Sequence, residues 1–250
     1  MRKSRILTVF LALAVVFTMS FAAVPAYAAS GTAITSVDDL KAMENNPGGS
    51  YYLANDIEVP EGLSLFTDSR TPFTGTFDGN GHAIKNYTYS TTTEDLMHAG
   101  LFCRTKNASF KNLTMTNVNI SVKSGGNFAA LAAYGQGTTF ENITVSGKLS
   151  ASGIVNSLGG IVGSLSGGSL TKCTNKADVT ITGAAEAAAA GVAGTASANT
   201  TVKNCSNSGA ISISGPIDGG RSYRAAGISN VAGTVISCKN TGNVSVKPSG

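Results

Sequence analysis

Three cysteines with nearly constant spacing are the first residues that could carry chemistry. They lie 32 and 33 residues apart, as Cys173, Cys205 and Cys238. Zinc sites need paired ligands, but the chain has no C-x-x-C pair, and its two histidines, His82 and His98, precede all three cysteines. The spacing favours stacked buried thiols over a disulfide, and a disulfide over a metal site. The fourth cysteine, Cys103, has no evident mate.

An asparagine follows each of these cysteines at a distance of two residues, as Asn175, Asn207 and Asn240. Strand side chains alternate between faces, so each asparagine points the same way as its cysteine. Amides stacked on one another can hydrogen-bond along the column. We therefore predict a structural ladder of cysteines and asparagines, and no cofactor.

A second polar cluster is the sequence "DGNGH" at 78–82. Oxygen ligands at alternate positions are typical of calcium loops, yet a tight glycine-rich corner in which Asp78 bonds the local backbone is the favoured interpretation. His82 and His98 could also meet across neighbouring coils, with Glu94 and Asp95 between them, as an acid–base group. We interpret these as solvated loop residues.

Carboxylates beyond Asp95 are too few and too scattered to favour an enzyme. They are Glu141, Asp178, Glu186 and Asp218. A glycosidase needs two carboxylates about 5–10 Å apart, which on a coiled fold means matching positions in adjacent coils. A lyase needs clustered acids with a base nearby. Neither grouping is visible, so a polysaccharide-active lyase or glycosidase is the alternative hypothesis.

The segment "PIDGGRSYRAAG" at 216–227 is the predicted binding site. It lengthens the spacing between recurring pieces and is expected to form a surface loop carrying Asp218, Arg221, Tyr223 and Arg224. Loops on rigid scaffolds concentrate binding groups, and arginine and tyrosine are favoured contact residues. A solvated insertion without a ligand is the competing interpretation.

Six similar segments must position all of these residues. Their leading apolar residues are spaced 33, 30, 30, 32 and 33 residues apart, at Phe77, Phe110, Phe140, Leu170, Val202 and Val235. A second recurring piece lies between them, as "AGLF" at 99, "AALA" at 129, "GGIVG" at 159, "AGVAG" at 190 and "AGISN" at 226. A period near 30 with alternating apolar residues indicates stacked coils of short strands.

The repeat predicts an all-β fold, a right-handed parallel β-helix of about six coils. One unit cannot bury enough apolar surface alone, so the units must stack. Corners are expected at Asn207-Ser208-Gly209 and Asn240-Thr241-Gly242, because asparagine and glycine tolerate left-handed backbone. A short helix from Ser36 to about Asn45, followed by a strand over 51–59, is expected to cap the first coil. The last coil has no comparable cap, so an end-to-end partner there is possible.

The N-terminus predicts export. A basic start, an apolar run from Ile6 to Phe17 and "AYA" at 26–28 fit a signal peptide over 1–28, too short for a membrane span. Without the signal peptide, the chain has 15 basic and 14 acidic residues, so its net charge does not favour binding to nucleic acid. We expect a cap and first strands over 29–75 and repeats over 76–250, with no membrane span in the mature chain.

The order "DLKAM…YYLANDIEV…FTGTFDGNGHAIKNYT…AGLF…GGIVG…KNCSNSG" resembles the GLUG-repeat class of bacterial surface proteins. It is also similar to the repeat region of bacterial zinc peptidases that cleave immunoglobulin A. The resemblance covers 34–246 and implies a parallel β-helix at or outside the cell surface, often in adhesins. Those peptidases need H-E-x-x-H, which this chain lacks, so their activity is not implied.

The sequence thus predicts a secreted, non-catalytic surface or adhesion module that binds a glycan or a host or cell-surface protein. The alternatives are the polysaccharide-active enzyme and a structural spacer without a ligand.

Overall fold

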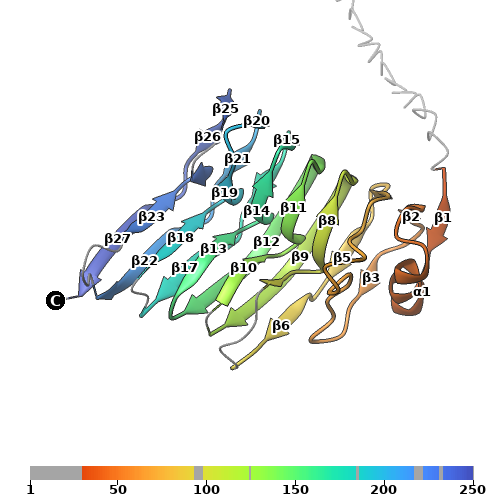
Figure 1. Ribbon diagram of the computed structural model, residues 1–250, viewed down its shortest axis with the longest axis horizontal. Helices are drawn as coiled ribbons and strands as arrows, with labels where there is room; N and C mark the ends of the chain where they lie inside the picture. Colours follow the sequence, from red (N-terminus) through yellow and green to blue (C-terminus); the bar gives the residue numbers. More distant parts are fainter. Residues whose placement is uncertain are drawn as a thin grey trace, which may run out of the picture.

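The computed structural model describes residues 30–92, 98–123, 125–183, 186–216, 222–230 and 233–249. The chain forms a parallel β-solenoid of about six turns, with one short helix at its N-terminal end and strand β27 at the opposite end (Figure 1). The predicted parallel β-helix with a short capping helix is therefore confirmed. The predicted signal peptide, 1–28, lies outside the described residues.

Three parallel sheets form the walls of the solenoid. Sheet I contains β1 (Thr32–Ile34), β2 (Ser50–Leu53), β3 (Ile57–Glu58), β4 (Thr76–Asp78), β5 (Ala83–Lys85), β6 (Thr88–Ser90), β9 (Ser109–Val122), β12 (Thr139–Ser152), β15 (Gly168–Thr171), β16 (Thr174–Asn175), β17 (Asp178–Thr182), β20 (Thr200–Lys203), β21 (Ser206–Asn207), β22 (Ile211–Pro216), β25 (Thr234–Ile236), β26 (Lys239–Asn240) and β27 (Val244–Ser249).

The other two walls have five strands each. Sheet II contains β7 (His98–Ala99), β10 (Gly125–Ala129), β13 (Val155–Gly159), β18 (Ala187–Ala190) and β23 (Tyr223–Ala226). Sheet III contains β8 (Phe102–Lys106), β11 (Ala132–Gln136), β14 (Val162–Ser166), β19 (Ala193–Ala196) and β24 (Ser229–Asn230). Each full turn passes from sheet I to sheet II and then to sheet III.

Side chains of the repeat stack in register along the interior. The register pairs Phe77 with Phe110, Phe110 with Phe140 and Phe140 with Leu170, and continues through Val202 to Val235. All of these are fully buried except Val235, which is 52% exposed on the last coil. The repeat read from the sequence is thus the stacking unit, because each coil covers the apolar face of the one before it.

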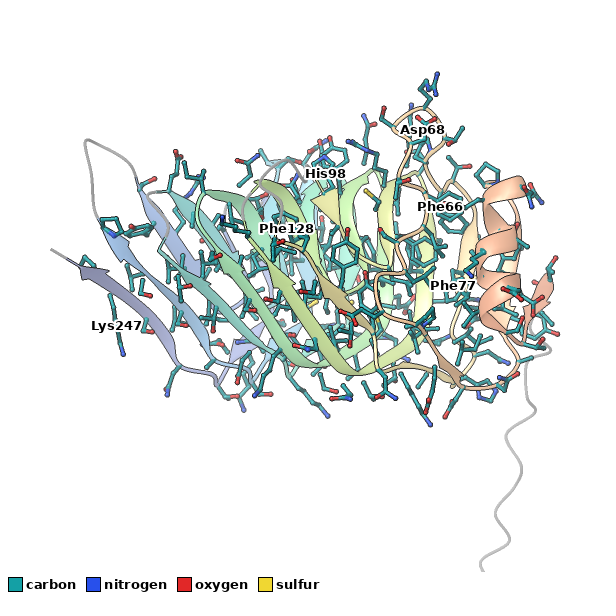
Figure 2. All side chains as sticks on the ribbon, turned by 90° about the horizontal axis from the view of Figure 1, so that it is seen from below. Phe66, Asp68, Phe77, His98, Phe128 and Lys247 are labelled. Atoms are coloured by element: carbon teal, nitrogen blue, oxygen red, sulfur yellow. The ribbon has the colours of Figure 1, made fainter. Side chains whose placement is uncertain are left out.

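Aromatic rings concentrate at the N-terminal half of this core. Phe110 stacks on Phe140 with ring centroids 5.3 Å apart and meets Phe102 edge-on at 4.8 Å. Figure 2 shows Phe77 and Phe128 inside the coils, whereas Asp68 lies on a loop that projects from them. Later coils fill the same space with smaller alanine, valine and cysteine side chains.

A helical cap closes the first coil. Helix α1 (Val37–Ala42) begins at a capping box in which Ser36 and Asp39 bond each other's backbone, and a 3₁₀ turn, η1 (Met43–Asn45), continues it. Leu40 is fully buried against the core. The predicted helix is confirmed, but the strand expected over 51–59 is two strands, β2 and β3, separated by a turn.

The left-handed corners differ from those predicted. Neither Asn207 nor Gly209 has a positive φ. The left-handed residue instead directly precedes the inward residue in five successive coils, at Asn112, Asn142, Lys172, Asn204 and Ser237. The chain does bend at Gly209 and Gly242, as predicted, but without a left-handed residue, and Asn207 makes a buried amide contact instead.

The asparagine column forms a continuous hydrogen-bonded ladder. Nδ2 of Asn175 donates to Oδ1 of Asn207 at 2.7 Å, and Nδ2 of Asn207 donates to Oδ1 of Asn240 at 2.7 Å. Each amide also donates to a carbonyl two residues further on, such as that of Gly209 at 2.9 Å. A Cβ built on Gly191 would lie 2.3 Å from Cγ of Asn207, so the facing "GGIVG"-type pieces need glycine there.

The cysteines lie beside this ladder as an inward column. Cys173 and Cys205 are buried, and Cys238 is half-buried on the last coil. Each thiol donates to a carbonyl of the preceding coil, as Cys205 does to Leu170 at 3.5 Å. The hydrogen bond with Cys205, together with burial, raises the pKa of the Cys173 thiol, so this thiol stays protonated and packs as a small apolar group.

Candidate binding site

The predicted binding segment is described only in part. Asp218 and Arg221 lie outside the described residues. Tyr223 and Arg224 belong to strand β23 rather than to a loop, so the loop prediction was wrong for these two. The Tyr223 ring packs against the core and its hydroxyl donates to the Pro216 carbonyl, whereas Arg224 is exposed. A binding role for this segment stays a prediction.

The polar cluster at 78–82 is engaged in local contacts. Oδ1 of Asp78 accepts hydrogen bonds from the Asn80 backbone and from Nδ2 of Asn112, and Oδ2 pairs with Lys111 at 3.2 Å. His82 lies 3.5 Å from Asp56 on sheet I, whereas His98 lies in sheet II. The structure therefore does not bring the two histidines together. Among the residues it describes, no three His, Cys, Asp or Glu side chains gather as a metal site would require.

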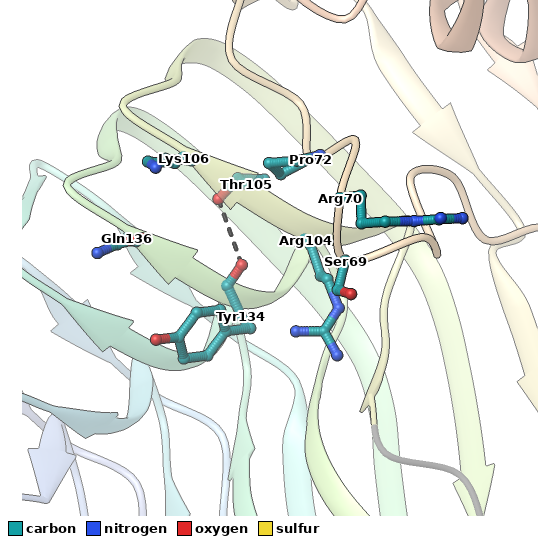
Figure 3. Close-up of a pocket in the computed structure, with 8 residues that line it drawn as sticks. All are labelled: Ser69, Arg70, Pro72, Arg104, Thr105, Lys106, Tyr134 and Gln136. Carbon is teal, nitrogen blue, oxygen red and sulfur yellow. Dashed lines mark hydrogen bonds between the residues drawn. The ribbon is translucent and has the colours of Figure 1, made fainter.

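A cleft at the N-terminal end of sheet III gathers the polar groups that the repeat does not explain. Its volume is about 210 Å³, and Figure 3 shows the residues that line it, which are Ser69, Arg70, Pro72, Arg104, Thr105, Lys106, Tyr134 and Gln136. This volume is below the roughly 300 Å³ at which pockets enclose a whole small ligand. The cleft therefore fits a single ring or acidic group of a larger molecule.

An irregular segment builds one wall of the cleft. Leu65 pairs with Phe102 and Phe73 pairs with Thr105, both in parallel bridges, so 65–73 lies along the edge of β8. The two bridges are eight residues apart along this segment, from Leu65 to Phe73, but only three residues apart along β8, from Phe102 to Thr105. The surplus residues project outward as the loop at 67–72 (Figure 2).

Asp68 and Arg70 fix the shape of this loop. Oδ1 of Asp68 accepts a hydrogen bond from the Arg70 backbone N–H at 2.9 Å. The Arg70 guanidinium donates hydrogen bonds to both carboxylate oxygens at 2.8–3.2 Å. These bonds lower the pKa of Asp68 to about 2. Because Asp68 neutralises Arg70, the loop adds little net charge to the cleft.

The floor of the cleft consists of outward residues of β8 and β11. Tyr134 pairs with Arg104 and Gln136 pairs with Lys106 across the two strands. Thr105, between the two cations, points inward, and its hydroxyl lies 2.9 Å from that of Thr138. The alternation of the strand thus places two cations, a phenol and an amide on one surface.

Arg104 is unusual among the basic residues. Of the lysines and arginines that the structure describes, only Lys85 and Arg104 are half-buried. Lys85 pairs with Asp56 at 2.6 Å, whereas no described carboxylate lies within ion-pair distance of Arg104. Its Nε is buried and has no hydrogen-bond partner among the described residues. A partly desolvated cation without a partner favours a bound anion.

His98 holds the Tyr134 ring in place. The two rings stack with centroids 5.8 Å apart and an interplanar angle of 23°. Nδ1 of His98 accepts the Asn127 backbone N–H at 3.2 Å, which requires this nitrogen to be unprotonated. Burial, and then the positive charge of Arg104, lower the pKa of His98 to about 4. The imidazole is therefore neutral at physiological pH.

This depressed pKa predicts a pH-dependent stability. An unfolded histidine takes up a proton near pH 6.5 and the folded one only near pH 4, so stability should fall as pH drops through that window. We expect a loss on the order of 1 kcal/mol, discounted because the ring is partly exposed. Urea denaturation at pH 7 and pH 4.5 measures it. A His98→Phe variant should lose clearly less stability than the wild type, and an equal loss in both would contradict the assignment.

The cleft was not predicted from the sequence, although one signal for it was present. Equivalent outward positions in later coils carry small hydroxyl residues: Ser164 stands beside Tyr134, Thr195 stands beside Ser164, and Ser166 stands beside Gln136. A column-by-column comparison of the coils therefore singles out Arg104, Lys106 and Tyr134. The loop that completes the cleft precedes the first clear repeat, so no periodicity marks it.

Comparison with known proteins gives three similarities. Residues 26–147 match the family model for the N-terminal region of M26 IgA1-specific metallo-endopeptidases. Halomucin of Haloquadratum walsbyi is 30% identical over 147 residues, which cover 52% of this chain and 2% of halomucin. A crystal structure of a candidate immunoglobulin A1 protease from Bacteroides ovatus superposes with a TM-score of 0.60 at 19% identity, covering 86% of this chain and 78% of that one.

These similarities confirm the resemblance to the β-helical repeat region of the IgA-cleaving peptidases. The structural match supports the fold alone. Its sequence identity of 19% is too low to support an inference about function. The match to the family concerns its N-terminal region, and the chain spans only a small part of halomucin. In the described part of the chain, no helix has the length and apolar character needed to cross a membrane.

Proposed function

We propose that the protein is an exported, non-catalytic binding module of the cell surface, of the GLUG-repeat kind. On this proposal residues 1–28 direct export, and the solenoid presents a rigid side wall to a glycan or a protein. The cleft between the loop at 67–72 and strands β8 and β11 is the binding site. The similarity to the N-terminal region of IgA1-specific metallo-endopeptidases supports a role outside the catalytic part of such proteins.

The half-buried Arg104 beside Tyr134, which has no ion-pair partner among the described residues, is the observation that carries this proposal. A spacer needs only a solvated outer surface, and the later coils meet that need with serine and threonine. Arginine and tyrosine are the residue types that dominate binding surfaces. Here they stand on paired strands of a sheet, which holds them with little conformational freedom and so lowers the entropic cost of binding.

The cleft does not favour hydrolysis or elimination. Of the described residues that line it, none is a carboxylate, a histidine or a cysteine. Asp68, on the adjoining loop, is bound through both oxygens to Arg70. Hydrolysis of a glycosidic bond requires two carboxylates that face the same bond. Binding without turnover is therefore the function that the side chains support best.

An array of glycans and host-matrix proteins, probed with the purified protein, tests the proposal. We expect specific binding that falls by about tenfold or more in an Arg104→Gln/Tyr134→Ala variant, since both are predicted hot-spot residues. A Tyr223→Ala/Arg224→Ala variant tests the segment at β23 in parallel. Circular dichroism confirms that each variant is folded.

The other outcomes decide between the alternatives. Loss of binding in the β23 variant but not in the cleft variant would place the site in the segment originally predicted from the sequence. Absence of binding to every member of the array would favour a spacer. Release of reducing ends or unsaturated sugars from a polysaccharide would show an enzyme instead.

A further inference from the structure

We propose that the cleft binds a carboxylate-bearing sugar, such as a uronic acid residue of an acidic polysaccharide, with its carboxylate on Arg104. This inference rests on the proposed function and specifies the ligand of the same site. It starts from the charge of the cleft. With Arg70 neutralised by Asp68, the described residues that line the cleft carry an excess of two positive charges, from Arg104 and Lys106.

The position of Arg104 favours a planar anion. Its Nε is buried and lacks a hydrogen-bond partner in the described structure, while the guanidinium faces the cleft beside Ser69 and Tyr134 (Figure 3). A guanidinium presents parallel N–H donors that match the two oxygens of a carboxylate. Such a pair would form through the terminal N–H groups and compensate the charge, whereas Nε itself is covered by protein. Lys106 is exposed and adds attraction at longer range.

The remaining groups suit a sugar ring. Tyr134 offers an aromatic ring whose orientation His98 fixes, and aromatic rings provide rigid, amphipathic contact area. Gln136 and Ser69 contribute an amide and a hydroxyl, which donate and accept hydrogen bonds as sugar hydroxyls require. Ser164, Ser166 and Thr195 continue this hydroxyl surface across the next two coils. A polymer can therefore extend along the wall beyond the cleft.

An acidic peptide fits the site less well. Extended peptides gain most of their affinity by adding a strand to an exposed sheet edge. The N-terminal edge of β8 is already covered by the segment 65–73 through two bridges. The open surface of sheet III presents side chains rather than backbone groups. A peptide would therefore be bound only through its acidic side chains and not through its backbone.

Isothermal titration calorimetry with three probes tests the inference. The probes are trigalacturonate, its methyl ester and a sulfated disaccharide of a galactan, which carries no carboxylate. We expect trigalacturonate to bind, with the ester at least about tenfold weaker because it cannot form the charge-assisted pair. Arg104→Gln should lower the affinity for trigalacturonate by a similar factor, and Arg104→Lys should retain only part of the lost affinity.

Lys203→Gln is the matched control, because Lys203 is an exposed lysine on sheet I with no ion pair in the described part of the chain, and its substitution should not affect binding. Equal affinity for the acid and its ester, tighter binding of the sulfated disaccharide, or no effect of Arg104→Gln would each overturn the inference. So would tighter binding of an oligoaspartate peptide through Arg104. If the array shows a neutral glycan or a protein bound through the cleft, the proposed function survives and this inference fails; if nothing binds, both fail.

Discussion

Asn207→Ala is expected to lower the free energy of unfolding by about 4 kcal/mol, one of the two largest effects we predict. Asn207 is 1% exposed and makes three side-chain hydrogen bonds, to Asn175, Asn240 and the Gly209 carbonyl. Truncation removes all three bonds in a buried or partly buried setting, although the Asn175 amide keeps its bond to the Ala177 carbonyl, and each lost bond costs about 1–3 kcal/mol. Urea denaturation followed by circular dichroism measures the change.

The adjacent Ser208→Ala is the matched control, because Ser208 is exposed and should change stability by less than about 0.5 kcal/mol. Asn240→Ala, on the exposed last rung, keeps the test informative if Asn207→Ala does not fold. It should cost less than Asn207→Ala, since water can replace its partner. Equal stability of wild type and Asn207→Ala would show that the ladder contributes no net stability.

Phe110→Ala should cost a similar amount, about 4 kcal/mol, by opening a cavity in the aromatic core. Phe110 is fully buried and contacts four other phenylalanine rings, with centroid distances of 4.8–6.3 Å to Phe73, Phe77, Phe102 and Phe140. Phe110→Leu should cost less, because leucine refills most of the space. The chain has no tryptophan, so circular dichroism is again the suitable probe.

Ile154→Ala is the control for the core variant. Ile154 is a large apolar residue that is 47% exposed, so its truncation should change stability by less than about 0.5 kcal/mol. A loss for Phe110→Ala no larger than that for Ile154→Ala would mean that the aromatic rings do not pack as the structure shows.

The sequence predicted the solenoid well because its two periodicities report directly on burial. Alternation within a coil and recurrence near 30 residues placed Cys205, Asn207 and Ile211 on the inner face, where the structure has them. The capping helix was predictable for a similar reason, since Ser36 and Asp39 form a local motif with its own hydrogen bonds. These features depend on neighbours in the chain or on equivalent positions in the repeat.

Other features depend on contacts that the sequence does not encode locally. The left-handed corners fall at residues as different as Asn204, Lys172 and Ser237, because the solenoid imposes the bend whatever residue stands there. The cleft forms only because 65–73 bridges to β8, and neither bridge follows a repeat. Arg104 and Tyr134 could be recognised as exceptions only after the coils had been aligned in space.

A crystal structure of the protein with trigalacturonate is the decisive experiment for the cleft, because it locates the ligand as well as detecting it. We expect a carboxylate within hydrogen-bond distance of the Arg104 guanidinium and a sugar ring against Tyr134, with the sugar chain continuing past Ser164. A ligand bound on sheet I, along β23 or at the last coil, with the cleft empty, would contradict this expectation.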